Sequence, residues 1–224
     1  MKGNTLENEW LLLYFNGTTM EGIAMDDSSP VADSLYFRLH TAFPGETGLG
    51  STSQAAYTGY APVPVARDGT GFTVTANSVS PAANVEFGEC TASPGNPLMF
   101  WSIGRSDVDS AAVDYYGPLG SRLGPFTALA DNNVFIPGSS LSVDDRVCLT
   151  DIPGGTFPAG ATAGTVYYVL TAPGSSVYTL STSSGGGVLD ISAAGSGYAW
   201  RVTPVTMAEG VIPRIKTTST LVED

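Results

Sequence analysis

Histidine and cysteine are scarce in this chain of 224 residues. It has one histidine, His40, and two cysteines, Cys90 and Cys148. A serine triad or a multi-histidine zinc site would therefore lack a group or depend on that single imidazole. The two cysteines are too far apart for a zinc-ligand pair and too few for a disulfide scaffold, so we expect two separate buried thiols rather than a bridge. We expect no catalytic residues, no metal and no cofactor.

Positive charge and long apolar runs are also in short supply. Nine Lys and Arg stand against 21 Asp and Glu, which gives a net charge of −12. That charge repels nucleic-acid phosphates and anionic membranes. The apolar run at 10–15 is too short to span a bilayer, and no small-residue cleavage signature follows it. The sequence predicts neither a nucleic-acid partner nor a membrane partner.

Glycine and proline are abundant: 27 Gly and 15 Pro make up about 19% of the chain, against roughly 12% in ordinary domains. Short segments rich in apolar and β-branched residues lie between these turn residues. No helix long enough for a parallel crossover lies between them, so the strands should pair antiparallel. We predict a mainly β fold, an antiparallel sandwich or jelly-roll-like domain. The expected strands are 35–40, 62–67, 72–75, 79–87, 98–104, 111–119, 142–149, 165–171, 177–182, 188–192 and 198–203.

The ends and the middle of the chain differ from this pattern. Apolar residues at 10–15 approximate one face of a short N-terminal helix, or arm, that ends at Asn16-Gly17. The glycine-punctuated segment 126–203 predicts an inserted small β module. The β-branched tail at 204–224 predicts a last strand that returns to the first domain. We therefore expect a β-sandwich domain at 1–125, completed by 204–224, with the module inserted.

Four segments resemble a family of tailed-bacteriophage virion proteins, known as tail-fibre or decoration proteins. They read SLYFRLHTAFPG at 34–45, AYTGYA at 56–61, NSVSPAAN at 77–84 and GVIPRIKTTST at 210–220. Within the middle module, FPAGATAGTVYYV at 157–169, with 145–147, 178–181 and 195–197, is similar to a small β module of phage fibres and head proteins. The first family often lacks this module, so the chain departs from it by insertion. The resemblance implies a virion accessory role and supplies no enzymatic residues.

We expect structural roles for the acidic clusters and for the histidine. Asp26-Asp27, Asp107 with Asp109, Asp131 and Asp144-Asp145 complete no calcium loop, so we interpret them as solvated turn aspartates. No nucleophile motif lies near His40, which favours a hydrogen-bonded structural histidine over a general base.

Paired aromatic residues predict interfaces, because neighbours on a strand point to opposite sides and one ring of each pair can face a partner. Our first hypothesis is a capsid decoration (cement) protein on the outer surface of the phage head, made in the host bacterial cytoplasm. Its expected partners are the major capsid protein and two further copies in a homotrimer. The alternative is a tail-fibre or receptor-binding component that contacts the host surface. The candidate partner contacts are Trp10, Leu11, Tyr14, Phe15, Tyr115 and Tyr116, and the candidate glycan contacts under the alternative are Tyr198 and Trp200.

Overall fold

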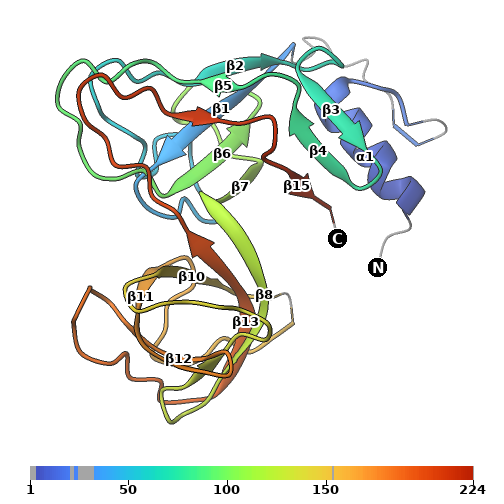
Figure 1. Ribbon diagram of the computed structural model, residues 1–224. Coiled ribbons are helices and arrows are strands. Elements are labelled where there is room, and N and C mark those ends of the chain that lie inside the picture. Colours follow the sequence, from blue (N-terminus) through green and yellow to red (C-terminus); the bar gives the residue numbers. More distant parts are fainter. Residues whose placement is uncertain (1–3, 21–22, 25–32, 153, 224) are drawn as a thin grey trace.

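A computed structural model describes residues 4–20, 23–24, 33–152 and 154–223. The chain is 40% strand and 6% helix, which confirms the predicted mainly β class. Figure 1 shows two lobes, a larger one that carries helix α1 (Asn4–Asn16) and a smaller barrel. Asp26 and Asp27 lie outside the described residues. None of the helical segments in the described ranges is long and apolar enough to cross a bilayer.

The larger lobe is built from three antiparallel sheets around one core, which is compatible with the predicted sandwich. A four-stranded sheet has the order β2-β1-β6-β7, a three-stranded sheet the order β15-β4-β3, and a two-stranded sheet pairs β14 with β5. Through β14 and β15 the chain's tail pairs with strands of this lobe. The strands are β1 (Ser34–His40), β2 (Val63–Ala66), β3 (Phe72–Thr75), β4 (Ser78–Pro81), β5 (Val85–Glu86), β6 (Phe100–Gly104), β7 (Tyr115–Pro118), β14 (Arg214–Ile215) and β15 (Leu221–Val222).

The smaller lobe is a closed six-stranded barrel with the order β10-β11-β12-β9-β8-β13. Its interior holds a second apolar cluster that includes Phe126, Leu149 and Tyr167. Closure leaves no exposed strand edge, so this small module can be stable without a large core. The strands are β8 (Gly120–Ala128), β9 (Val134–Phe135), β10 (Arg146–Thr150), β11 (Val166–Gly174), β12 (Val177–Ser181) and β13 (Gly195–Val202).

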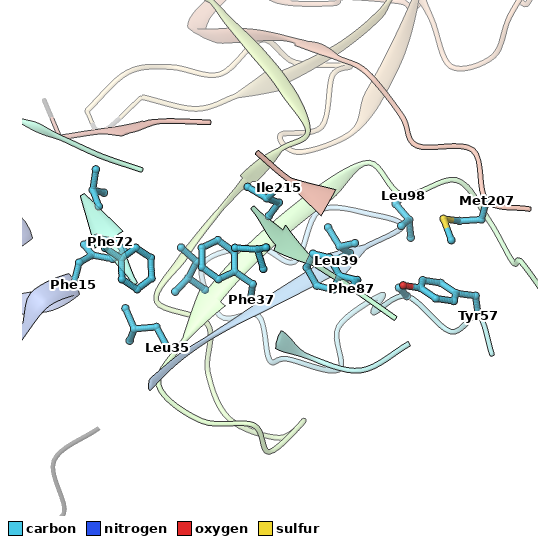
Figure 2. Close-up of a cluster of buried hydrophobic side chains, with 14 of the residues drawn as sticks. Phe15, Leu35, Phe37, Leu39, Tyr57, Phe72, Phe87, Leu98, Met207 and Ile215 are labelled. Carbon is cyan, nitrogen blue, oxygen red and sulfur yellow. The ribbon is translucent and has the colours of Figure 1, made fainter. Parts of the chain in front are cut away.

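Strand β1 follows the predicted alternation, and its polar face is buried as well. Leu35, Phe37 and Leu39 point into the core of the larger lobe, as Figure 2 shows. Arg38 and His40 on the opposite face are also buried, at 1% and 0% exposure. The strand is therefore covered on both faces, because β1 is central in its sheet and loops pack over its polar side.

The observed strands differ from the expected ones in several places. The segment 79–87 divides into β4 and β5, which belong to different sheets. Strand β8 begins at Gly120 and so crosses the expected boundary at 126. Its Pro125 lies opposite Tyr198 of β13, and β9 pairs with β8 only at Thr127 and beyond, so on the β9 side the missing N–H costs no ladder bond.

The expected strand at 188–192 is wrong. These residues form one isolated bridge, between Ser181 and Val188, and no strand. Their backbone N–H groups have other acceptors. The Leu189 N–H donates to the Leu180 carbonyl, and the Ile191 N–H donates to the side-chain oxygen of Asn132. A side-chain acceptor has thus replaced a ladder partner.

Two chain crossings join the lobes at an apolar junction. Strands β7 and β8 are separated by Leu119 alone, and Leu119 accepts a hydrogen bond from the Thr203 N–H, where the chain leaves the barrel. Phe100 of the larger lobe packs there in one buried cluster with Cys148 and Val202 of the barrel strands. Both cysteines are free buried thiols, as predicted, and burial raises the pKa of Cys148 to about 12.

Candidate functional site

An aromatic groove of about 540 Å³ lies on the larger lobe. It lies between helix α1, the start of β7 and the residue that follows β15, and these segments lie on one side of that lobe (Figure 1). Three of the predicted contact residues line it. The lining residues of this aromatic groove are Leu6, Trp10, Tyr14, Asp114, Tyr115 and Glu223.

Helix α1 supplies one wall of the groove because two adjacent stripes of its surface have different roles. Residues four apart lie on the same helix face. One such stripe contains Leu11 and Phe15, both 0% exposed in the core of the larger lobe. The neighbouring stripe is Leu6, Trp10 and Tyr14, which faces the groove. The structure therefore corrects the expectation that Leu11 and Phe15 contact a partner, since both are covered by their own lobe.

The C-terminus of α1 is fixed by a residue from another part of the lobe. Arg67 donates from Nε to the Tyr14 carbonyl at 2.7 Å and from Nη2 to the Leu13 carbonyl at 2.5 Å. The last turn of the helix has no basic residue of its own, so this guanidinium supplies the cation that its exposed carbonyls favour. Gly17 follows the helix with φ of 64°, the left-handed conformation typical of a helix stop. The helix is thus held in position beside the groove.

The rings of the aromatic groove hold one another in place. The Trp10 indole Nε1 donates to the Tyr115 hydroxyl at 3.0 Å. The Tyr14 ring meets the Tyr115 ring edge-on, with centroids 5.1 Å apart. Trp10 nevertheless keeps 43% of its surface exposed, and Leu6 keeps 40%. The groove therefore offers a fixed apolar surface to solvent.

A carboxylate at the base of the groove is bound from two sides. The Tyr14 hydroxyl donates to Asp114 at 2.8 Å, and Arg105 donates to both carboxylate oxygens at 3.0 and 3.1 Å. Burial raises the pKa of Tyr14, and the Asp114 carboxylate raises it further. Burial also raises the pKa of Tyr115, with smaller contributions from the charges of Glu223 and Asp114. The charge of Asp114 is balanced by the Arg105 guanidinium, which lies 3.0 Å from it.

Tyr116 and Trp200 lie at the lobe junction. Tyr116 packs edge-on against Phe43, with centroids 5.3 Å apart, and Trp200 packs against the buried junction cluster. The Trp200 indole also donates to the Thr150 hydroxyl at 3.2 Å. Both rings are half-buried. Phe43, against which Tyr116 packs, lies beside Gly164 of the barrel, and the cluster against which Trp200 packs has residues from both lobes.

Tyr198 points outward from the barrel, and a cation already lies on its ring. The Arg122 guanidinium carbon lies 4.2 Å from the Tyr198 ring centroid and 6.0 Å from that of Trp200. This cation–π contact covers ring surface that a stacked sugar would need. Tyr198 and Trp200 thus lie next to each other, with the Arg122 guanidinium near both rings.

His40 makes a contact with a serine that the sequence did not indicate. Its Nδ1 lies 2.8 Å from the Thr52 carbonyl and its Nε2 lies 2.7 Å from the Ser102 hydroxyl. Because a carbonyl only accepts, Nδ1 carries the proton and Nε2 accepts from Ser102. Both side chains are 0% exposed. The pair has the spacing of a catalytic dyad, but it is buried and both ring nitrogens have partners within the fold, so His40 is the hydrogen-bonded histidine that was expected.

We predict that His40 makes the protein less stable in mild acid. Burial lowers the pKa of His40 below its usual 6.5. As the pH falls, the unfolded chain therefore binds this proton first, so the contribution of His40 is complete above about pH 6.5 and is lost as the pH falls through the folded-state pKa. Urea unfolding of wild type and His40→Gln at pH 7.5 and pH 5 should show a stability gap that narrows in acid. A constant gap would contradict this prediction.

The aspartates of the described acidic clusters accept hydrogen bonds from nearby groups of the protein. Asp131 accepts from the Asn133 N–H at 3.1 Å, and Asp145 accepts from the Ser142 N–H at 2.9 Å. Asp144 accepts from the Ser184 hydroxyl at 2.6 Å. Across the described ranges, no group of three or more acidic, histidine or cysteine side chains is arranged to hold a metal ion.

Comparison with known proteins does not assign this chain to a family. No protein-family model matches this chain. No curated protein is significantly similar to it either. The functional argument therefore depends on the geometry of the groove and on the sequence features themselves.

The sequence did not predict three of the six residues that line the groove: Leu6, Asp114 and Glu223. The i, i+4 spacing of Leu6, Trp10 and Tyr14 was a usable signal, because it separates their stripe from that of Leu11 and Phe15. Nothing in the sequence connects Asp114 or Glu223 with this helix. They reach the groove only because β7 and β15 pair within the larger lobe near α1.

Proposed function

We propose that this chain is a structural protein of a tailed-bacteriophage virion, a decoration protein that binds the outer surface of the head and stabilises the shell. The observation that carries the proposal is the aromatic groove, where the exposed Trp10 is held beside Tyr115 on a rigid lobe. Aromatic residues fixed at a surface are typical of protein interfaces. The resemblance of the segments at 34–84 and 210–220 to phage virion proteins supports the choice of partner, the major capsid protein.

The chemistry of the described residues supports binding rather than catalysis. In the groove, Asp114 is occupied by Arg105 and Tyr14. A general acid or base needs a carboxyl group or imidazole that reaches the substrate. The His40–Ser102 pair has the right residue types but is closed to solvent. Both arrangements fit a protein that acts through its surfaces.

The charge distribution supports an outer position on the shell. Residues 120–202 contain three Arg and five Asp, a net −2, so the other residues account for −10 of the total of −12. Such a surface would be repelled by packaged DNA and is better suited to the outside of a head. A homotrimer at a symmetry axis of the shell would place three grooves on neighbouring capsid subunits. Binding only to the assembled shell would stabilise it by mass action.

The proposal predicts where this chain lies in the particle. Cryo-electron microscopy of purified virions should show its density repeated over the icosahedral shell, and quantitative mass spectrometry should find it in many copies per particle. Density confined to the tail, with few copies, would contradict a decoration protein. That result would favour the tail-fibre alternative, in which the barrel face around Tyr198 contacts the host.

A further inference from the structure

We propose that copies of this chain meet through one outer face of the barrel, centred on Phe135. The inference deepens the proposed function and rests on it for the homotrimer, since it names the contact between copies that a trimer on the shell requires. The aromatic groove and this face belong to different lobes (Figure 1), so one can bind the shell while the other binds a second copy. The Phe135 face is made up of Thr127, Leu129, Phe135, Val177, Thr179 and Ser196.

Strand pairing sets Phe135 in a row of outward side chains that crosses four strands. It lies opposite Thr127 of β8 on one side and opposite Val177 of β12 on the other. Ser196 of β13 lies opposite Thr127 and extends the row. Apart from Ser196, each residue of the face has a strand neighbour in the barrel core, so alternation turns it outward. Side chains that lie directly opposite share one face of a sheet, so Ser196 points outward as well.

The Phe135 face is apolar at its centre and carries no charge. Phe135 keeps 42% of its surface exposed, and Leu129, which follows β8, keeps 54%. None of the residues of the face has an ionisable side chain. The Thr179 hydroxyl is hydrogen-bonded to that of Thr171 at 2.7 Å, so it keeps a partner when water is removed. Such a surface is desolvated at little electrostatic cost, as at the centre of a protein interface.

The distribution of charge selects a second copy as the occupant. Outside residues 120–202 the chain carries a net −10, so two larger lobes repel each other. The barrel carries a net −2, and copies can approach with least repulsion at its uncharged face. Asp131, in the hairpin beside Leu129, accepts from the Asn133 N–H at 3.1 Å and so is directed to its own turn. A face without charges also offers no complementary pattern to a strongly charged partner.

The size of the Phe135 face sets the expected strength of the contact. Four strands about 4.8 Å apart make a surface roughly 15–20 Å across, which is smaller than the surface that stable dimers bury. We therefore expect weak, reversible self-association in solution. On the shell, copies docked side by side are held at a high effective concentration, which completes the contact between them.

The test measures self-association of the full-length protein by sedimentation equilibrium from low to high micromolar concentration. Reversible trimers are expected, and added salt should strengthen them because it screens the repulsion between acidic copies. Phe135→Thr, which keeps a β-branched residue in the strand, should weaken association about tenfold. A monomer at every concentration, or association that weakens as salt is added, would overturn the proposal.

Two variants with matched charge locate the contact. Thr127→Lys and Thr73→Lys each replace an exposed threonine of a strand, and each adds one positive charge to the net −12. Thr127→Lys places an ammonium group in the face and should abolish association, because burial of an unpaired charge is costly. Thr73→Lys lies on β3 of the larger lobe and should leave association intact. Equal association of the two variants would overturn the Phe135 face as the contact.

Circular dichroism of Thr127→Lys checks that the barrel keeps its fold. If that variant is disturbed, Leu129→Ser decides the result, because Leu129 is 54% exposed and lies beyond the end of β8. It should weaken association, and unchanged association would overturn the face.

The outcomes separate this inference from the proposed function. Association that Thr127→Lys abolishes, together with virion density on the tail, would keep the Phe135 face and overturn the decoration role. Density on the shell, together with a monomer in solution, would overturn the face and leave the decoration role standing. A dimer that depends on Thr127 would support the contact and contradict the homotrimer.

Discussion

Phe15→Ala is expected to lower the free energy of unfolding by about 3–5 kcal/mol, the usual cost of truncating a fully buried phenylalanine. The Phe15 side chain is 0% exposed. Its ring lies 5.0 Å from that of Phe72 and 5.5 Å from that of Tyr115, measured between centroids. Figure 2 shows Phe15 beside Phe72 at one end of the core of the larger lobe. Removal of the ring leaves a cavity under helix α1, so the helix should be released and the aromatic groove lost with it.

The measurement is denaturant unfolding followed by circular dichroism. Trp10→Ala is the control, because it lies on the same helix but is 43% exposed, and it should change stability by less than about 1 kcal/mol. A Phe15→Ala protein as stable as the Trp10→Ala protein would show that α1 does not depend on its buried stripe. The two variants together separate a buried residue of helix α1 from an exposed one.

Gly164→Ala is expected to weaken the junction between the lobes. Gly164 has φ of +79°, and a Cβ there would lie 2.1 Å from Cδ1 of the Phe43 ring. Phe43 has little room to move, since its ring packs edge-on against those of Phe100 and Tyr116. Overpacking of this kind costs about 1–3 kcal/mol, and a left-handed backbone adds about 1–2 kcal/mol for a residue with a side chain.

Gly138→Ala is the matched control for this junction variant. Gly138 also lies in the barrel lobe and has φ of +71°, but a Cβ there would meet nothing within 4 Å. It should therefore show the backbone cost alone. Thermal unfolding of both variants against wild type measures the difference between them. Equal destabilisation by the two substitutions would mean that Phe43 moves aside at no cost and that the junction is not tightly packed.

The junction also decides what several aromatic residues can do. Tyr116 and Trp200 stood out in sequence as residues available to a partner or a glycan, but both pack at the junction. Alternation along a strand correctly indicates that adjacent rings point to opposite sides. It does not indicate whether the outer side meets solvent or a second lobe of the same chain, because that depends on how the two lobes come together.

The difference between local pattern and tertiary packing also explains which strands were predicted. Strand β1 and most of its neighbours have alternating or β-branched residues between turn residues, so local pattern was sufficient. Strand β8 was missed because Pro125 normally ends a strand. Only the barrel's pairing scheme, in which β9 joins β8 beyond that proline, makes the residue acceptable.

Local physics in the sequence determined the β class, the helix that stops at Gly17, the two buried thiols and the strongly negative charge, because each depends on the composition or spacing of neighbouring residues. Tertiary structure alone decided that Trp10 and Tyr14 meet Asp114, Tyr115 and Glu223, that Leu11 and Phe15 are buried, and that His40 meets Ser102. These contacts join segments many residues apart, and their energy appears only when the sheets pack around a common core.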